Sequence, residues 1–395
     1  MPLAMKPAEM NAHPQAALCF AFPPAAPAGT EMPHLAATSA PAPETVLRPD
    51  VLALSAYAVA DATGMVKLDA MENPYSLPQV VRDEVARAVA MAPVNRYPDP
   101  TAPGLKRQLR ATMRVPAGIE LLLGNGSDEI IQLLALAVAR PGSVIVGVEP
   151  SFVMFRLLAM FAGVTFVGVP LKPDFSLDEA ALMAAIREHR PALMFIAYPN
   201  NPTGNLFDRS VIERIVAAAP GLVVLDEAYH AFAGESFIGD LERLPNLVVM
   251  RTLSKLGLAG LRLGFLMGRA QWLDQLDKVR MPYNINVLTQ LAAEVVLAHA
   301  DVLEDQTRAI LKGRGTLAGA LSAVRGVTVF PSAANFLLFR VAGATRVYEA
   351  LKARRILIKN LSAGHPLLAD CLRVTVGTPA ENQQFLAALE TIVAS

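Results

Sequence analysis

The stretch RTLSKLGLAGLRLGF, residues 251–265, decides how the chain is interpreted. It directly follows an apolar run at 247–250 that is typical of a buried strand, and it places Ser254 and Lys255 just beyond that strand, with Arg262 further along. A lysine there can bind a carbonyl compound covalently, while a hydroxyl and a guanidinium can hold a phosphate. The stretch therefore predicts a site for a cofactor with a carbonyl group and a phosphate, although a Ser-Lys pair alone also occurs in plain surface turns.

The composition is that of a globular protein with no electrostatic preference for nucleic acid or an anionic membrane. Of 395 residues, 53% are hydrophobic and 18% charged, and 35 basic residues balance 35 acidic ones. The two cysteines, Cys19 and Cys371, argue against a disulfide framework and indicate a reducing, cytoplasmic compartment. The six histidines have no metal-ligand spacing, so we expect no metal site.

The N-terminal segment differs from the rest of the chain. It is rich in proline and alanine and carries few charges, and such a segment cannot maintain a helical or strand period. Residues 1–46 are therefore predicted to be a disordered extension. A signal peptide is the less favoured alternative, because a basic start and a compact apolar region are both missing.

The middle of the chain alternates short apolar runs with helical patterns. These predict, for example, a helix over 127–140 and a buried strand over 143–148. Repeated units of this kind form a mostly parallel sheet with helices on both faces, which is an α/β fold. Ligands bind beyond the carboxyl ends of such strands, and Asn201, Asp226 and Lys255 each fall at or just after an apolar run.

The pattern changes after about residue 281. A long helical tract covers roughly 287–324, and short strands then alternate with helices to the C-terminus. This pattern predicts a second, smaller α+β domain.

Two further segments complete a characteristic order of residues. They are YPNNPTG at 198–204 and VLDEAYHAF at 224–232, which supply Asn201, then Asp226 and Tyr229, ahead of the lysine of the first stretch. This order and spacing resemble the fold-type I aminotransferases, which use pyridoxal 5′-phosphate (PLP). Within that group the chain is most similar to the histidinol-phosphate aminotransferase family.

The resemblance extends from about residue 48 to the C-terminus. It implies a large PLP-binding domain at 79–284 and a small domain made of 47–78 and 285–395. It also implies an enzyme of histidine biosynthesis that converts L-histidinol phosphate and 2-oxoglutarate to 3-(imidazol-4-yl)-2-oxopropyl phosphate and L-glutamate. Members of the family are homodimers, in which Tyr97 of this sequence is expected to reach the partner's cofactor phosphate.

The resemblance assigns five residues to the cofactor ring. Lys255 is expected to bind PLP covalently and to move a proton once substrate has displaced it. Asp226 is expected to keep the pyridine nitrogen protonated, and Tyr229 and Asn201 to donate hydrogen bonds to the phenolic oxygen. Phe152 would stack on the ring face; ordinary core packing is the alternative interpretation.

The cofactor phosphate is expected to bind where the segment GNGSDE opens a helix. The free backbone N–H groups of Gly126, Ser127 and Asp128 would face the anion, because a helix N-terminus carries partial positive charge. Ser254 and Arg262 would complete this phosphate site, with Arg262 as a two-pronged donor.

Substrate is expected to contact Tyr57, Asn73, Asn335, Lys359 and Arg373. The resemblance assigns Arg373 to the substrate carboxylate and to the phosphate of histidinol phosphate. At the position of Lys359 many family members have a second arginine. A lysine can still neutralise a phosphate, but it lacks the two-pronged geometry.

Three alternative functions remain open at this stage. An aminotransferase for aromatic amino acids and a threonine-phosphate decarboxylase would share the fold and the cofactor. A PLP-binding regulatory protein without catalytic turnover is a more distant possibility, since the N-terminal segment has neither the basic charge nor the helical period of a DNA-binding region.

Overall fold

The computed structural model describes residues 41–56 and 59–394. They belong to two compact units, the first of which ends at Leu54. Its described part contains two short helices without buried residues, α1 (Pro43–Val46) and α2 (Pro49–Leu52). The end of the predicted disordered extension thus forms a helical turn, and the first 40 residues of that prediction lie outside the described part of the chain.

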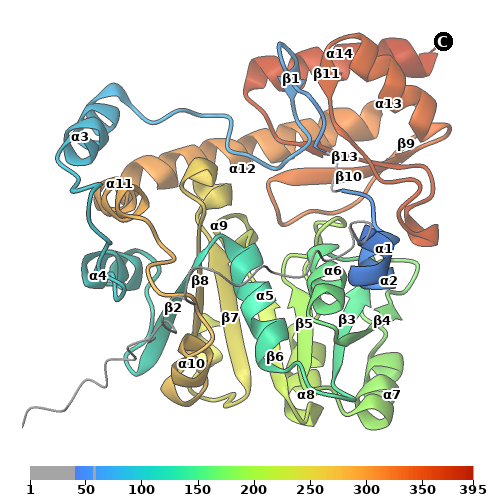
Figure 1. Cartoon of the computed structure of the whole chain (residues 1–395). Helices are drawn as coiled ribbons and strands as arrows, with labels where there is room; N and C mark the ends of the chain where they lie inside the picture. The colour runs from blue at the N-terminus through green and yellow to red at the C-terminus, as the bar shows by residue number, and fades with distance from the viewer. Residues whose placement is uncertain (1–40, 57–58, 395) are drawn as a thin grey trace, which may run out of the picture. The chain divides into compact units, whose positions relative to one another are not determined.

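The second unit is built on a seven-stranded sheet with the order β2-β8-β7-β6-β5-β3-β4 (Figure 1). The strands are β2 (Ile119–Asn125), β3 (Val144–Glu149), β4 (Thr165–Pro170), β5 (Leu193–Ala197), β6 (Leu222–Asp226), β7 (Leu247–Thr252) and β8 (Leu263–Arg269). Every neighbouring pair is parallel except the two pairs that β8 forms with β2 and β7. The predicted α/β fold with a mostly parallel sheet is confirmed, while the direction of β8 and the presence of β2 were not predicted.

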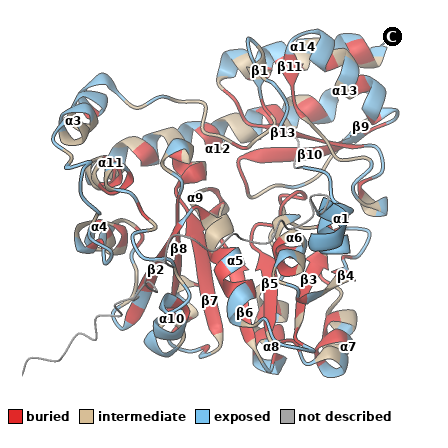
Figure 2. Ribbon diagram, viewed as in Figure 1, coloured by how far each residue is buried: buried red, intermediate tan, exposed pale blue. Residues whose placement is uncertain are grey.

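Helices cover both faces of this sheet, which explains why its central strands are apolar throughout. Val223 and Leu225 of β6 belong to a core shared with residues of α7 and α8, whereas Leu222 and Val224 belong to a second core shared with α5 and α6. Figure 2 shows these strands as buried and the outer helix faces as exposed. The alternation also directs Asp226, two residues after Val224, toward the α5 face.

The helices predicted over 127–140 and 287–324 are present with different bounds. The helices of the second unit are α3 (Gln79–Ala90), α4 (Pro103–Thr112), α5 (Ser127–Ala137), α6 (Met154–Phe161), α7 (Glu179–His189), α8 (Arg209–Ala218), α9 (His230–Ala233), α10 (Ala270–Asp277), α11 (Val287–Ala298), α12 (Ala300–Ala323), α13 (Ala344–Ala353) and α14 (Pro379–Ala394). The tract predicted over 287–324 is two helices, because His299 has a ψ of 47° and interrupts it. No helix in the described ranges is long and apolar enough to cross a membrane.

Two smaller sheets carry the C-terminal strands. One has the order β12-β13-β10-β9, and the other pairs β1 with β11 in parallel. The strands are β1 (Val66–Lys67), β9 (Val327–Val329), β10 (Phe336–Val341), β11 (Ile356–Leu357), β12 (Lys359–Asn360) and β13 (Cys371–Thr375). Leu68 joins Phe336, Phe339 and Phe385 in a core separate from those of the large sheet. The exact domain boundaries stay a prediction.

Candidate active site

A cavity of about 220 Å³ lies where the parallel strands of the large sheet end. It is lined by Ala70, Met71, Glu72, Ser127, Asp128, Phe152, Ala197, Pro199, Asn201, Asp226, Ala228, Tyr229, Thr252, Ser254, Lys255, Ala259 and Arg262. Nine of the residues predicted to bind the cofactor are in this set. They come from segments far apart in the sequence and meet because parallel strands end at the same edge of a sheet.

Lys255 lies just after β7, in the single 3-10 turn η2 (Ser254–Leu256). Its ammonium group donates a hydrogen bond to the backbone carbonyl of Ala70 over 3.2 Å. Burial and the nearby guanidinium of Arg373 lower the pKa of Lys255 to about 8. At physiological pH, a larger fraction of Lys255 is therefore in the neutral, nucleophilic amine form than in an ordinary surface lysine.

Asp226 is the last residue of β6 and is buried. Its Oδ1 accepts a hydrogen bond from the backbone N–H of Ala228, 3.0 Å away, and no described residue donates to Oδ2. Burial raises the pKa of Asp226 to about 7, although the positive charge of Lys255 acts in the opposite direction. A buried carboxylate with an open oxygen suits a ligand that brings a charged N–H donor, such as a pyridinium ring.

Asn201 and Tyr229 line the same cavity from two different loops. The side-chain oxygen of Asn201 accepts a hydrogen bond from Arg373, so the amide NH₂ is the part of Asn201 left to donate to a ligand. The ring of Tyr229 packs edge-on against Phe336, with 5.2 Å between centroids. Burial raises the pKa of Tyr229, which keeps its hydroxyl protonated as a donor.

The first turn of α5 forms the predicted phosphate end of the cavity. Ser127 and Asp128 line it together with Arg262, whose Nη2 lies 3.4 Å from Asp128 Oδ2. Gly126 does not line the cavity, but a Cβ there would come within 2.5 Å of Arg262 Nη2. Glycine at 126, with its φ of 82°, thus leaves room for the guanidinium beside the free N–H groups of the helix. Together with Ser254, these donors suit an anion such as a phosphate.

A second cavity of about 500 Å³ shares Met71, Phe152 and Asn201 with the first. Lys359 and Arg373 line it. Since the two residues are register partners across the antiparallel strands β12 and β13, their side chains lie on the same face of that sheet. The predicted substrate cations therefore meet next to the predicted cofactor residues.

The remaining predicted site residues do not line either cavity. The side-chain amide of Asn73 donates to Leu256 and Gln306, and that of Asn335 donates to the backbone carbonyl of Met71. Asn73 thus supports Leu256, which follows Lys255, and Asn335 supports Met71, which lines both cavities. A direct contact with substrate stays a prediction for both asparagines. Tyr57 lies outside the described residues. Tyr97 is on the surface, 81% exposed.

Comparison with known proteins agrees with this geometry. Residues 63–389 match the family described as aminotransferase class I and II. The chain belongs to this family. The chain is 56% identical over 350 residues to histidinol-phosphate aminotransferase 2 of Cupriavidus pinatubonensis, covering 87% of this chain and 96% of the relative. It is 55% identical to histidinol-phosphate aminotransferase 1 of Ralstonia nicotianae, covering 87% and 93% of the two chains.

A solved structure gives the same result for the fold. The histidinol-phosphate aminotransferase from Sinorhizobium meliloti, in complex with pyridoxal-5'-phosphate, superposes with a TM-score of 0.79 at 25% identity. The match covers 89% of this aminotransferase and 98% of that chain.

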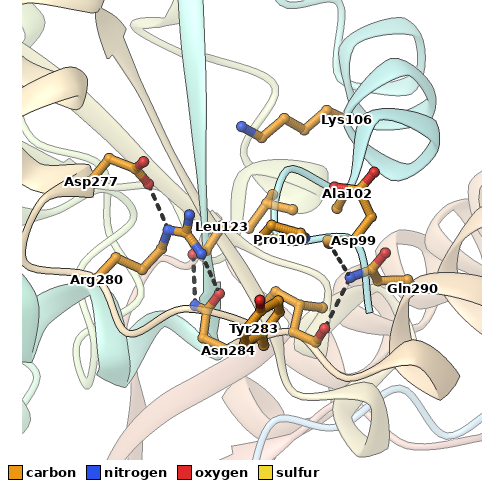
Figure 3. A pocket seen from close by; sticks show the side chains of 11 residues that line it. Asp99, Pro100, Ala102, Lys106, Leu123, Asp277, Arg280, Tyr283, Asn284 and Gln290 are labelled. Carbon is orange, nitrogen blue, oxygen red and sulfur yellow. Dashed lines mark hydrogen bonds and ion pairs between the residues drawn. The ribbon is translucent and has the colours of Figure 1, made fainter. Parts of the chain in front are cut away.

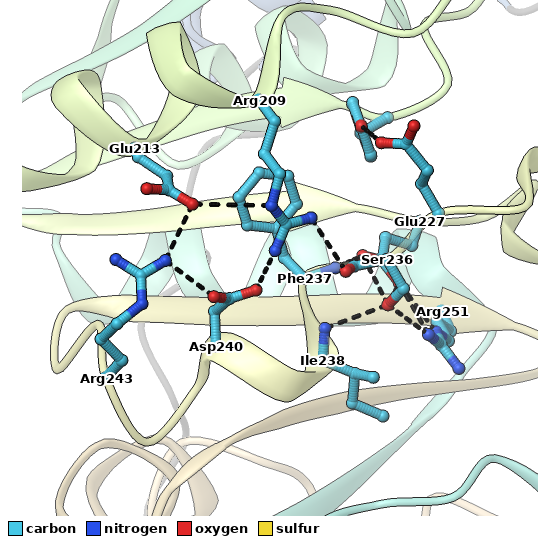
Figure 4. Close-up of polar contacts among 11 residues, drawn as sticks. Arg209, Glu213, Glu227, Ser236, Phe237, Ile238, Asp240, Arg243 and Arg251 are labelled. Atoms are coloured by element: carbon cyan, nitrogen blue, oxygen red, sulfur yellow. Dashed lines mark hydrogen bonds and ion pairs between the residues drawn. The ribbon is translucent and has the colours of Figure 1, made fainter.

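Sequence reasoning missed a buried ion pair between Glu227 and Arg251, which follow and precede active-site segments of the aminotransferase (Figure 4). Glu227, directly after Asp226, accepts hydrogen bonds from Arg251, from the hydroxyl of Ser236 and from the backbone N–H of Phe237. The side chains of Glu227 and Arg251 are 0% and 5% exposed. Because Glu227 follows β6 and Arg251 belongs to β7, the pair fixes the strand ends from which Asp226 and Lys255 project. In the sequence, the glutamate of the segment DEAY (226–229) and the arginine before TLSK (252–255) are the two residues that could have indicated this pair.

Replacing Arg251 with alanine should destabilise the aminotransferase strongly, because it leaves Glu227 charged, buried and without its partner. Removing one member of a buried pair costs about 3–5 kcal/mol. The matched control is Arg214→Ala, since the Arg214–Glu179 pair is 51% and 35% exposed and should contribute little to the free energy of unfolding. Urea unfolding measures both, and equal losses would contradict a special role for the buried pair.

Proposed function

We propose that this aminotransferase transfers the amino group of L-histidinol phosphate to 2-oxoglutarate, with PLP as cofactor. The products are 3-(imidazol-4-yl)-2-oxopropyl phosphate and L-glutamate. The identity of 56% to a relative named histidinol-phosphate aminotransferase, over nearly its full length, is the observation that carries the proposal. Lys359 and Arg373, which line a cavity next to the predicted cofactor site, support a substrate with anionic groups.

The residues of the first cavity fit PLP. The α5 N-terminus, Ser254 and Arg262 would hold the phosphate, and Asp226 would pair with the ring nitrogen. When bound, PLP supplies an electron-withdrawing ring that stabilises the negative charge left at the substrate Cα after its proton departs. Asp226 would maintain that withdrawal by keeping a negative charge beside the ring nitrogen.

Lys255 would perform the proton transfer. Its Nζ would accept the proton from the substrate Cα and return it to the cofactor side, which requires the neutral amine. Burial and Arg373 both favour that neutral form. Asn201 and Tyr229 would orient the ring by donating hydrogen bonds to its phenolic oxygen, while Arg373, which fixes the Asn201 amide, would also bind the substrate anion.

A homodimer is part of the proposal, and the surface around Tyr97 supports it. Tyr97 stacks on Tyr283 with 4.5 Å between ring centroids, and Met91 and Met281 are 83% and 70% exposed. Exposed aromatic and methionine side chains are enriched in interfaces between subunits. Tyr97 of each subunit would reach the cofactor phosphate of its partner. The two cysteines of the chain fit a cytoplasmic location, which we also propose.

The segment that presents Tyr283 is anchored by polar contacts (Figure 3). Asn284 receives a hydrogen bond from Arg280 and donates one to the backbone carbonyl of Leu123, at 2.8 and 3.1 Å. Gln290 donates to the backbone carbonyl of Asp99, close in sequence to Tyr97. An anchored apolar surface loses little conformational freedom when a partner binds it.

The substrate assignment is tested by half-reactions of the PLP-loaded enzyme. We expect L-histidinol phosphate to react with a kcat/KM at least about 100-fold above that of L-phenylalanine, since a buried phosphate site left without its phosphate costs several kcal/mol. L-Threonine phosphate, which carries a phosphate but no imidazole, is compared in the same way and should also react more slowly. The spectral change of the cofactor reports each reaction. A preference for phenylalanine would contradict the proposed substrate and leave the aminotransferase chemistry intact.

The rate at which the apoenzyme binds PLP covalently should rise with pH. The lowered pKa of Lys255 places the change from ammonium to amine near pH 8, so the rate should increase between about pH 7 and 9 and then level off. In Arg373→Gln the pH at the midpoint of this increase should be higher, because the positive charge that lowers the pKa of Lys255 has been removed. Stopped-flow absorbance measures the rate, and Lys255→Ala, which should show no covalent binding, is the control.

The aminotransferase should have twice the subunit mass in light scattering at micromolar concentration. Met281→Asp should increase the fraction of monomer, because it places a charge in the proposed apolar interface. Phe161→Asp is the matched control, since Phe161 is an exposed apolar residue of α6, 43% accessible, away from this surface. A monomeric parent protein, or equal effects of both variants, would contradict the proposed interface.

A further inference from the structure

Lys359 and Arg373 line the second cavity, and among the described residues no carboxylate pairs with Lys359. Lys359 and Arg373 are directly opposed across β12 and β13, an arrangement that is unfavourable for like charges unless an anion lies between or beside them. Glu149 is the one acidic residue among the described residues that line this cavity, and its Oε1 is 2.8 Å from Nε of Arg156. The cavity therefore suits a ligand anion.

Lys359 alone is a poor match for a phosphate. Among the described residues, no group lies within hydrogen-bond or ion-pair distance of its ammonium, so it is available to the ligand as one compact charge. Arg373 is partly engaged, since it donates to Asn201 and, over 3.0 Å, to the backbone carbonyl of Asp69. A phosphate monoester has three terminal oxygens, which leaves room for a further donor.

His365 supplies a further hydrogen-bond donor on the wall of this cavity. It lines the same cavity, just after a turn closed by the hydrogen bond from Gly364 N–H to the Leu361 carbonyl, 2.9 Å long. Its Nδ1 accepts a hydrogen bond from the backbone N–H of Leu367 over 3.2 Å and thereby caps the short 3-10 turn η4 (Pro366–Leu368). Because Nδ1 is the acceptor, the ring proton is on Nε2, and Nε2 has no hydrogen-bond partner among the described residues.

We propose that His365 is a specificity-determining residue whose Nε2–H donates a hydrogen bond to a phosphate oxygen of the substrate, beside the Lys359 ammonium. With Nδ1 accepting from Leu367, Nε2–H is the donor that the ring can offer to the phosphate. The histidine thus provides part of the directional recognition that a lysine at position 359 lacks compared with an arginine. This inference rests on the proposed function, because it names a further contact to the proposed substrate.

The two nitrogens of His365 can be tested separately. In His365→Asn the amide oxygen can still cap η4 in place of Nδ1, but the side chain is too short to replace Nε2–H. In His365→Gln the amide N–H lies near the former Nε2, and the cap is lost. His365→Ala removes both groups. Each variant is prepared as the PLP-loaded enzyme and compared with the parent protein.

The measured quantity is the ratio of kcat/KM for L-histidinol phosphate to kcat/KM for L-histidinol, followed as single half-reactions. His365→Asn and His365→Ala should lower this ratio about tenfold through KM, which corresponds to one lost hydrogen bond to a charged group. His365→Gln should retain most of the preference. The half-reaction with L-histidinol, which has no anionic group for this site, should change less than about twofold in all three.

Three other outcomes would contradict the assignment of His365 to the phosphate, and each has a different explanation. If His365→Asn behaves like the parent while His365→Gln is impaired, the histidine acts only as the cap of η4. If phosphorylated and unphosphorylated substrates lose activity equally, it shapes the site without contacting the phosphate. If the parent enzyme itself does not prefer L-histidinol phosphate over L-histidinol, the proposed function fails, and the assignment fails with it.

Discussion

The guanidinium of Arg373 holds the active site together. It donates hydrogen bonds to the side chain of Asn201, at the carboxyl edge of the large sheet, and to the backbone of Asp69, in the segment that leads into the site. It also lies over the ring of Phe336, 5.2 Å from the centroid, in the core of the C-terminal sheets. One buried cation thus links three chain segments, orients the Asn201 amide and helps to lower the pKa of Lys255.

Two adjacent acidic residues at the end of β6 have different roles, one in stabilising the fold and one in binding a ligand. Glu227 has its hydrogen bonds supplied by Arg251, Ser236 and the backbone, and it connects β6 to β7. Asp226 is equally buried but keeps one oxygen open toward the cavity, and burial raises its pKa. A completely paired charge fixes the framework, whereas an incompletely paired one is available for a ligand.

The sequence predicted the fold class and the position of the site because both depend on local patterns. Apolar runs that alternate with helical stripes specify a parallel sheet, and the residues after those runs must meet at its carboxyl edge. Asn73 and Asn335 show the limit of this reasoning. Their amides bind backbone carbonyls at remote positions, and nothing in the neighbouring sequence indicates those partners. His365 was overlooked for the same reason, since only the folded turn brings it to the wall of a cavity.

The sequence by itself determined which segments become strands and helices, and which polar side chains follow them, because hydrophobic periodicity and turn residues act over a few positions. Tertiary structure alone decided the antiparallel direction of β8, the buried Glu227–Arg251 pair and the alignment of Lys359 opposite Arg373. These features depend on contacts between residues distant in the chain. A local pattern does not encode the partner or the direction of a strand, so the pairing is fixed only when the whole core packs.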